Sequence, residues 1–127
     1  MKYLLDTHVV LWAASNHSNL SETVKTLVLE SGSQKYVSIA SIWEVALKLG
    51  VGKLNIDGGL EAFYRMIDDN GFITLGIERK YVYRLTDLPL IHRDPFDRML
   101  IATALAEDLT LVTIDENIRK YDVPQIW

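Results

Sequence analysis

The sequence predicts a three-layer α/β/α sandwich around a central, mainly parallel sheet of four to five strands. Short apolar runs alternate along the chain with segments whose apolar residues recur at helical spacing. This alternation is typical of parallel sheets that carry helices on both faces. The predicted strands are almost entirely apolar, as a sheet buried on both faces requires. The chain shows no internal repeat and no linker, so we expect a single domain over residues 1–127.

Caps and glycines mark the ends of the predicted helices. Ser21 and the pair Asp94-Pro95 each precede a helical stripe and are typical helix starts. Gly32 and Gly50 follow such stripes and are typical helix ends. In chain order, the predicted elements are a strand at 3–5, a helical turn at 9–12, a helix from 21 to 32, a strand at 35–38, a helix over 42–49, a helix over 60–67, a strand at 72–75, a short helix at 79–85, a helix that opens at 94–95 and carries 96–105, a strand at 109–113, a short helix around 116–120 and a final extended piece that includes 123 and 126.

The composition limits the classes of function. Hydrophobic residues make up 49% of the 127 residues, which is enough for a packed core without a disulfide or a structural metal. The absence of cysteine excludes a disulfide framework, a thiolate zinc site and a cysteine nucleophile. No apolar run approaches the roughly 20 residues of a membrane span or forms a signal peptide, so we expect a cytoplasmic protein with no membrane segment. The net charge of −4 disfavours nucleic-acid binding unless basic residues cluster or metal ions neutralise some of the acids.

Carboxylates lie beside the predicted strands. Asp6 directly follows the first strand, and Asp115 follows the strand at 109–113. Glu44 lies in the first turns of the helix after the second strand, and Asp94 and Asp97 lie in the first turn of a later helix. Ligands of such sheets bind outside the carboxyl ends of the strands, so we expect these acids to converge there. Clustered carboxylates repel one another and favour a hard cation, Mg²⁺ or Mn²⁺, which in such sites activates water for phosphoryl chemistry.

Each of these carboxylates also has a purely structural interpretation. Asp6, together with Thr7, is suited to cap the helix that follows it. Glu44 stands at capping-box spacing from Ser41 and at ion-pair spacing from Lys48. The acids of the two later segments suit helix N-termini equally well. The occurrence of acids on four separate segments at one predicted edge favours the shared site.

Other polar residues give weaker signals. His8 and His92 show no spacing typical of a zinc site, and we interpret them as ordinary polar residues. Ser38 and Ser41 lack the surrounding glycines of a serine-hydrolase elbow. The sequence therefore points to no chemistry other than that of the carboxylates.

The acids stand in four short segments: LLDTH at 4–8, SIWEVA at 41–46, RDPFDRMLIA at 93–102 and VTID at 112–115. Together these segments resemble the four acidic motifs of PIN-domain ribonucleases, and most closely those of VapC-type toxins of type II toxin–antitoxin systems. The resemblance extends from Tyr3 to Trp127 and implies a PIN-like fold. Each motif is short, but all four in this order are quite specific.

The resemblance implies metal-dependent endonucleolytic cleavage of RNA. Asp6, Glu44, Asp97 and Asp115 then correspond to the catalytic and metal-binding acids, which hold one or two Mg²⁺ or Mn²⁺ ions that activate water against the phosphodiester. Asp6 and Asp97 are expected as main ligands, and the other two as supporting groups. Asp94 is expected as an auxiliary that orients the helix or contacts the metal through water.

The resemblance also implies partners and pocket residues. Thr7 and Thr113 match polar positions that line the pocket of the family. Family members usually dimerise, and a small antitoxin protein holds them inactive. An RNA substrate, a cognate antitoxin and a second copy of the chain are therefore the expected partners. The basic residues expected to contact RNA, each also interpretable as a solvated surface charge, are Lys48, Lys53, Arg79, Lys80, Arg93 and Arg98.

Three other classes remain open from the sequence. A phospho-accepting receiver-type module has a similar size and sheet, but it should carry an acidic pair after the first strand and an aspartate after the third. Here only Asp6 follows the first strand, and Gly76 follows the third. A haloacid-dehalogenase-type phosphatase would need a second aspartate at position 8, where the chain has His8. A catalytically silent PIN-like binding protein would share the fold and cleave no RNA.

Overall fold

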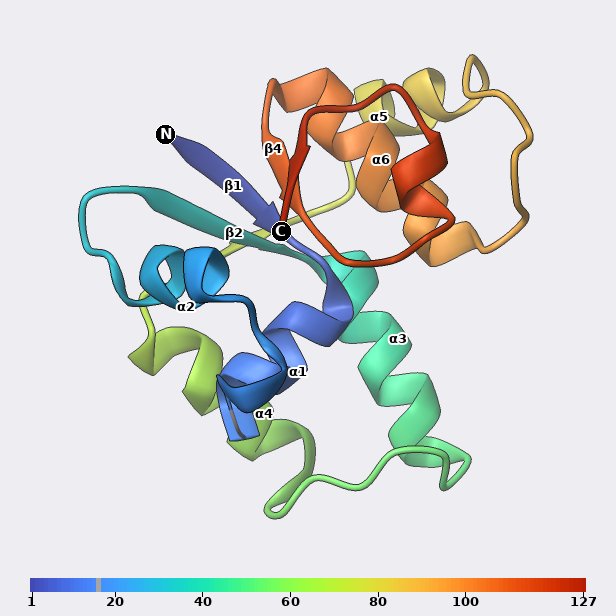
Figure 1. The fold of residues 1–127 in the computed structure, drawn as a ribbon. Coiled ribbons are helices and arrows are strands. Elements are labelled where there is room, and N and C mark those ends of the chain that lie inside the picture. Colours follow the sequence, from blue (N-terminus) through green and yellow to red (C-terminus); the bar gives the residue numbers. More distant parts are fainter. Residues whose placement is uncertain (16) are drawn as a thin grey trace.

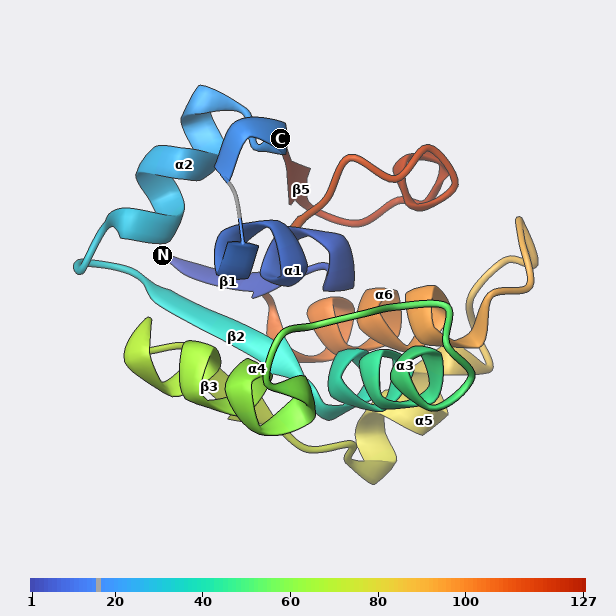
Figure 2. The ribbon, with the colours of Figure 1, turned by 90° about the horizontal axis from the view of Figure 1, so that it is seen from below.

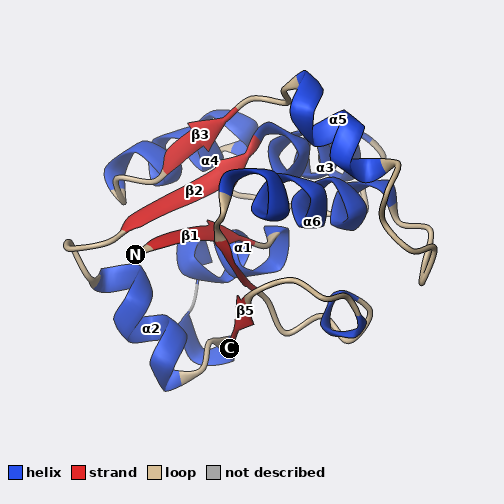
Figure 3. Ribbon diagram, turned by 90° about the horizontal axis from the view of Figure 1, so that it is seen from above, coloured by secondary structure: helices blue, strands red, loops and turns tan. Residues whose placement is uncertain are grey.

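Five parallel strands form one sheet in the order β3-β2-β1-β4-β5. The structure is a computed structural model, and it describes residues 1–15 and 17–127 (Figure 1). Figure 3 shows β3, β2 and β1 following one another across the sheet, with β5 at the opposite edge from β3. The strands are β1 (Lys2–Leu5), β2 (Gln34–Ser38), β3 (Ile73–Leu75), β4 (Thr110–Val112) and β5 (Gln125–Ile126). The predicted parallel sheet is thus confirmed.

The helices alternate with the strands along the chain, as predicted. Ser21 caps α2, because its hydroxyl oxygen accepts a hydrogen bond of 3.1 Å from the backbone N–H of Val24. The helices are α1 (Thr7–Ser15), α2 (Glu22–Leu29), α3 (Ile39–Gly50), α4 (Gly59–Asp69), α5 (Arg79–Leu85) and α6 (Pro95–Glu107), with two 3₁₀ turns, η1 (His17–Asn19) and η2 (Ile118–Lys120). The sequence did not predict η1.

The start of α3 differs from the predicted one. Ser38, the last residue of β2, is the N-cap, and its Oγ accepts from the N–H of Ala40 at 3.0 Å. The helix therefore begins directly after the strand, at Ile39, two residues before Ser41. The capping-box interpretation of Ser41 and Glu44 is wrong for this reason, whereas the ion pair of Glu44 with Lys48 is present.

Two apolar layers enclose the sheet. Side chains alternate across β1, so that Tyr3 and Leu5 pack with α1, α2 and α4, whereas Leu4 packs with α6 on the opposite face. Figure 1 shows these two groups of helices on either side of the strands. Leu4 and Leu5 are both fully buried, and burial of each contributes about 1.5–3 kcal/mol. The predicted α/β/α sandwich is confirmed.

The strands are less uniformly buried and less uniformly apolar than expected. Ile73 in the edge strand β3 is 41% exposed. Lys35 in β2 is buried, and its Nζ donates hydrogen bonds to the carbonyl oxygens of Leu27, Val28 and Glu30. These carbonyls end α2 and have no partner within the helix, so the lysine satisfies them.

The strand order places β1 beside β4 at the centre of the sheet, where the direction of the connections reverses. The backbone N–H of Asp6 donates to the carbonyl oxygen of Val112 at 3.0 Å, which holds the carboxyl ends of both strands together. Ligands of open α/β sheets bind at such a reversal point. The helix α3 contacts both α1 and α6 and closes this end of the sheet (Figure 2).

Among residues 1–15 and 17–127, none of the helices combines the length and the apolar character that a membrane span needs.

Candidate functional site

Asp6 lies at the reversal point, immediately after β1. It is only 4% exposed, and its Oδ2 accepts a hydrogen bond of 2.7 Å from the hydroxyl of Thr113. Burial raises the pKa of Asp6, and the charge of Asp115 acts in the same direction, whereas the hydrogen bond from Thr113 and the proximity of His8 lower it. Its burial and the repulsion from Asp115 thus destabilise the charged form of Asp6.

Thr113 links the acids of two segments. Its Oγ1 donates to Asp6 and accepts from the backbone N–H of Asp115 at 3.0 Å. Oδ1 of Asp115 in turn accepts from the backbone N–H groups of Asn117 at 2.8 Å and Ile118 at 3.0 Å. The N-cap of η2 is Asn117 rather than Asp115, but these two bonds fix the Asp115 side chain in the turn between β4 and η2.

Asp97 approaches the same place from the first turn of α6. Asp94 is the N-cap of that helix, and its Oδ1 accepts from the N–H of Asp97 at 2.9 Å. Burial first of all, together with the charges of Asp94, Asp6 and Asp115, raises the pKa of Asp97 to about 7, although a hydrogen bond from His92 acts in the opposite direction. Acids from three remote segments therefore act on one another electrostatically.

Glu44 is placed differently. Its Oε2 accepts from Nζ of Lys48 at 2.9 Å, and its side chain is 11% exposed. The Thr7 hydroxyl donates to Oγ of Ser41 at 2.9 Å, so the first turn of α3 lies against the start of α1. Glu44 stands one turn after Ser41 and shares its helix face. The structure couples Asp6 to the two later segments, while Lys48 neutralises Glu44.

Sequence reasoning missed the residues that hold Asp97. We had interpreted His92 as an ordinary polar residue, but its Nε2 lies 3.0 Å from Oδ2 of Asp97. Its Nδ1 lies 2.8 Å from the hydroxyl oxygen of Tyr121. His92 stands in the irregular segment between α5 and α6, and Tyr121 follows η2. No helical or strand spacing relates these positions, so no pattern in the sequence indicates them.

The sequence matches the model of the family described as PIN domain over residues 3–124. The chain belongs to the PIN domain family. Among curated proteins, none matches this sequence. Solved structures do share its fold. VapBC2 from Rickettsia felis, bound to a DNA fragment from its promoter, is 17% identical with a TM-score of 0.78, over 100% of this chain and 99% of that chain.

Two further structures give the same result. VapBC-1 from nontypeable Haemophilus influenzae is 16% identical, with a TM-score of 0.73 over 99% of this chain and 97% of that chain. FitAcB from Neisseria gonorrhoeae is 21% identical, with a TM-score of 0.63 over 98% of this chain and 96% of that chain. The predicted PIN-like fold is confirmed. The receiver-type alternative is wrong, because it requires the strand order 2-1-3-4-5, which differs from the order observed.

The donor chemistry of this PIN domain fits Mg²⁺ or Mn²⁺. In the part of the chain that the structure describes, no three His, Asp or Glu side chains stand together as a closed metal-binding group. The acids offer only carboxylate oxygens, the ligands that these hard cations prefer. Oδ2 of Asp97 is hydrogen-bonded to His92, so Oδ1 is the oxygen of this carboxylate that is left to bind a metal ion.

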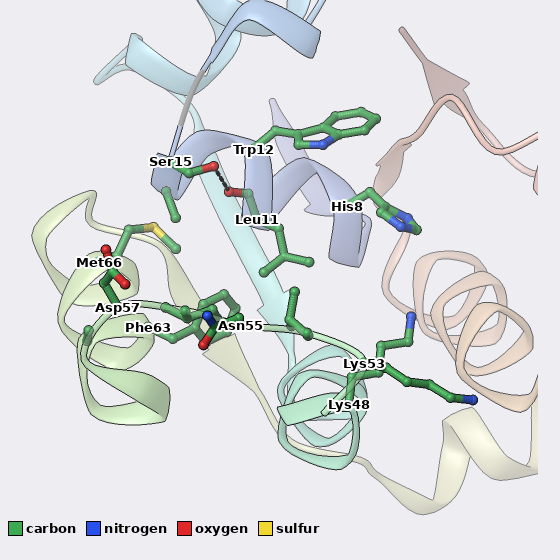
Figure 4. A pocket seen from close by; sticks show the side chains of 14 residues that line it. His8, Leu11, Trp12, Ser15, Lys48, Lys53, Asn55, Asp57, Phe63 and Met66 are labelled. Carbon is green, nitrogen blue, oxygen red and sulfur yellow. Dashed lines mark hydrogen bonds between the residues drawn. The ribbon is translucent and has the colours of Figure 1, made fainter. Parts of the chain in front are cut away.

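A groove of about 780 Å³ adjoins this end of the PIN domain. Figure 4 shows His8, Lys48 and Lys53 at one end of it and Asp57 and Met66 at the other. His8 stands two residues after Asp6, so the cationic end lies next to the acids. The apolar side chains of the groove come from α1, from the loop after α3 and from α4, namely Leu11, Trp12, Leu54, Ile56, Phe63 and Met66.

The remaining basic residues that the resemblance had indicated differ in their surroundings. Arg79 and Arg93 are exposed. Lys80 pairs with Glu107 at 2.5 Å. Nη1 of Arg98 donates to the carbonyl oxygen of Pro89 and to the hydroxyl oxygen of Tyr121, each at 2.9 Å, so this guanidinium is engaged within the protein.

Proposed function

We propose that this PIN domain is a metal-dependent endoribonuclease and the toxin of a toxin–antitoxin pair. The observation that carries the proposal is the mutual electrostatic action of Asp6, Asp97 and Asp115 at the reversal point of the sheet. Acids that repel one another in a buried place cost stability, and a divalent cation offsets that cost. Membership of the PIN domain family supports a nuclease use of this arrangement.

The side chains of the site divide the work. Asp6 and Asp97 are proposed as the main ligands of one or two Mg²⁺ or Mn²⁺ ions, with Glu44 and Asp115 as supporting groups and Asp94 as the residue that orients α6. When bound, such ions supply Lewis-acid stabilisation of the phosphate and lower the pKa of water. Thr113 donates to Asp6 and fixes its Oδ2, so the chain itself sets the direction of this carboxylate.

The RNA backbone needs cationic contacts, which the acidic surface provides only locally. Lys53, Arg79 and Arg93 are exposed and free to meet phosphate groups. Lys48 is partly exposed and Lys80 is exposed, but both already pair with acids, so they would contribute less. So few phosphate contacts predict weak binding of RNA and only a shallow decrease of its affinity as the salt concentration rises.

The groove beside the acids is proposed as the place of the antitoxin. A related solved structure is described as a toxin–antitoxin complex from Klebsiella pneumoniae, 18% identical to this chain. The half-buried side chains Trp12 and Met66 offer apolar contacts, and the exposed Lys53 offers positive charge at one end. A protein segment with apolar side chains and a few acids would therefore fit it.

A second copy of the chain is proposed to cover α3. Four large apolar side chains stand one turn apart on the outer face of this helix and the residue after it, and they are strongly exposed: Ile39 37%, Trp43 57%, Leu47 47% and Val51 68%. Such a contiguous stripe is typical of an interaction surface. Leu47→Glu should convert a homodimer into a monomer in sedimentation velocity, whereas an unchanged sedimentation coefficient would refute this interface. We place the protein in the cytoplasm, together with RNA and the antitoxin.

The test of the nuclease proposal uses purified protein freed of antitoxin and incubated with structured RNA. We expect cleavage with Mg²⁺ or Mn²⁺, its loss with EDTA, and its loss in Asp6→Asn. Asp87→Asn is the matched control, because Asp87 is exposed in the turn after α5 and should leave cleavage unchanged. EDTA-resistant cleavage, or an active Asp6→Asn variant, would refute the assignment. Absence of cleavage even with Mn²⁺ would favour the silent binding protein.

A further inference from the structure

Asp97 belongs to a connected hydrogen-bond network of four side chains, whose other members are His92, Tyr121 and Arg98. Tyr121 is 4% exposed, and its hydroxyl oxygen lies 2.8 Å from Nδ1 of His92 and accepts from Nη1 of Arg98 at 2.9 Å. It also accepts from the backbone N–H of His92 at 3.3 Å. On the other side of the imidazole, Nε2 meets Oδ2 of Asp97 at 3.0 Å. The rings of His92 and Tyr121 stand edge to face, with centroids 5.4 Å apart.

The proton positions in this network follow from counting donors and acceptors. The hydroxyl oxygen of Tyr121 has two lone pairs, and Arg98 and the N–H of His92 occupy both. It therefore offers no lone pair to a proton on Nδ1 of His92. The hydroxyl proton itself needs an acceptor, and Nδ1 at 2.8 Å is better placed than the carbonyl oxygen of His92 at 3.5 Å. Nδ1 is thus unprotonated, and the ring proton resides on Nε2.

We propose that Tyr121 and Arg98 hold the His92 ring with Nε2 toward Asp97, and that His92 is the positioning residue that orients the Asp97 carboxylate toward the metal. This inference rests on the proposed nuclease function. The Nε2–H group donates to Oδ2, so rotation of the carboxylate is restricted and Oδ1 is the oxygen left to bind a metal.

The location of the network supports this role. His92 and Asp97 have side chains that are 12% and 18% exposed, so water competes little with their hydrogen bond. Arg98 is anchored a second time at the carbonyl oxygen of Pro89, which fixes the far end of the network. Partners of this kind, which orient a metal-binding side chain without touching the metal, typically contribute 10–100-fold to metal affinity.

The first experiment reads the tautomer directly. A two-dimensional ¹H–¹⁵N correlation spectrum through two bonds, recorded on the metal-free protein at pH 8, distinguishes the Nε2–H, Nδ1–H and doubly protonated forms of His92. We expect the pattern of a single Nε2–H tautomer. An Nδ1–H pattern, a doubly protonated ring or an average of tautomers would overturn the inference.

The second experiment measures Mn²⁺ affinity by the electron-paramagnetic-resonance signal of free Mn²⁺. We expect His92→Ala and Tyr121→Phe to raise the dissociation constant by about tenfold or more. His92→Gln should recover most of the affinity, because its amide N–H reaches a position similar to Nε2. Tyr36→Phe is the matched control: it removes a hydroxyl that bonds only Gln34, the first residue of β2, at the far end of the sheet.

The outcomes separate this inference from the function on which it rests. Thermal melting in EDTA establishes that each variant is folded, and Tyr121→Phe keeps the ring that packs against His92. If wild-type protein binds Mn²⁺ and His92→Ala binds it equally well, the positioning role is overturned while the nuclease proposal stands. If wild-type protein binds no Mn²⁺ and cleaves no RNA, the proposed function itself is overturned, and the metal role of His92 with it.

Discussion

Replacement of Asp97 by Asn should stabilise the metal-free protein. The substitution removes one negative charge from a place where Asp6, Asp94 and Asp115 all act against it. It keeps the shape of the side chain, and the amide oxygen of Asn still accepts from Nε2 of His92, which lies 3.0 Å from Oδ2 of Asp97. The N-cap bond from the backbone N–H of residue 97 to Asp94 is unaffected, because it does not involve the side chain.

The size of the effect follows from the pKa of Asp97. Burial and neighbouring acids raise it from 3.8 to about 7, and at about 1.36 kcal/mol for each pKa unit the upper limit is about 4 kcal/mol. The side chain is 18% exposed, so solvent screening reduces this to about 1–2 kcal/mol. Loss of a charge that favours the helix N-terminus opposes it by about 0.5 kcal/mol. The repulsion is the larger effect, and we expect a net gain of about 1 kcal/mol.

The sign of the pH dependence is specific to a raised carboxyl pKa. Below pH 3.8 the Asp97 carboxyl is protonated in both the folded and the unfolded chain, and its contribution to stability is fully present. Between pH 3.8 and about 7 the unfolded chain ionises while the folded chain keeps its proton, so this contribution is lost as pH rises. The gain of Asp97→Asn over wild type should therefore be seen at pH 8 and be largely absent at pH 4.

The assay is urea unfolding in EDTA at pH 4 and pH 8, followed by far-ultraviolet circular dichroism. Asp87→Asn, an exposed substitution, should change the free energy of unfolding by less than about 0.5 kcal/mol at either pH. The same titrations with Mn²⁺ should stabilise wild type more than Asp97→Asn. A variant less stable than wild type at pH 8, or a gain of equal size at both values of pH, would refute the reasoning.

Further predictions concern the same site and the core. Asp6→Asn should lower the rate of RNA cleavage by about a hundredfold or more, measured by single-turnover kinetics with Mn²⁺, and wild-type rates in that variant would contradict the site. Thr113→Val leaves the buried Asp6 carboxylate without its hydroxyl donor and should cost about 1–3 kcal/mol in urea unfolding. Thr103→Val is its control, since that hydroxyl only bonds the Met99 carbonyl oxygen of its own helix, and equal losses in both would argue against a special role of Thr113. Phe63→Ala removes a phenyl ring that is only 1% exposed and leaves a cavity in the core, so it should lower the free energy of unfolding by about 3–5 kcal/mol in the same measurement.

The secondary structure could be predicted because its signals are local. The capping bond of Asp94 to the N–H of residue 97 needs only four consecutive residues, and Pro95 at the first helical position strengthens it. The same holds for the helix after Ser21, whose start was correctly predicted. The start of α3 was wrong because Ser38 serves at once as the end of a strand and as a helix cap, a double role that periodicity does not reveal.

The site could be predicted only in part. Parallel topology was enough to predict that Asp6, Asp97 and Asp115 act on one another electrostatically. The same reasoning does not reach Glu44, which pairs with Lys48. The ion pair between Glu44 and Lys48 was among the interpretations left open. The contact of His92 with Tyr121 joins two irregular segments separated by 29 positions, and such a contact is determined by how loops pack on α6. Nothing in either local sequence carries that information.

The bond between Thr113 and Asp6 spans 107 positions in the chain. During synthesis, Asp6 therefore leaves the ribosome long before Thr113 does. While most of the domain is being made, β1 lacks its neighbour β4. Pairings between such distant segments form late in folding, because the entropy of closing a long loop must be overcome first. On the proposed function, an unfinished chain is harmless to RNA, and the catalytic centre comes into being only with the final strands.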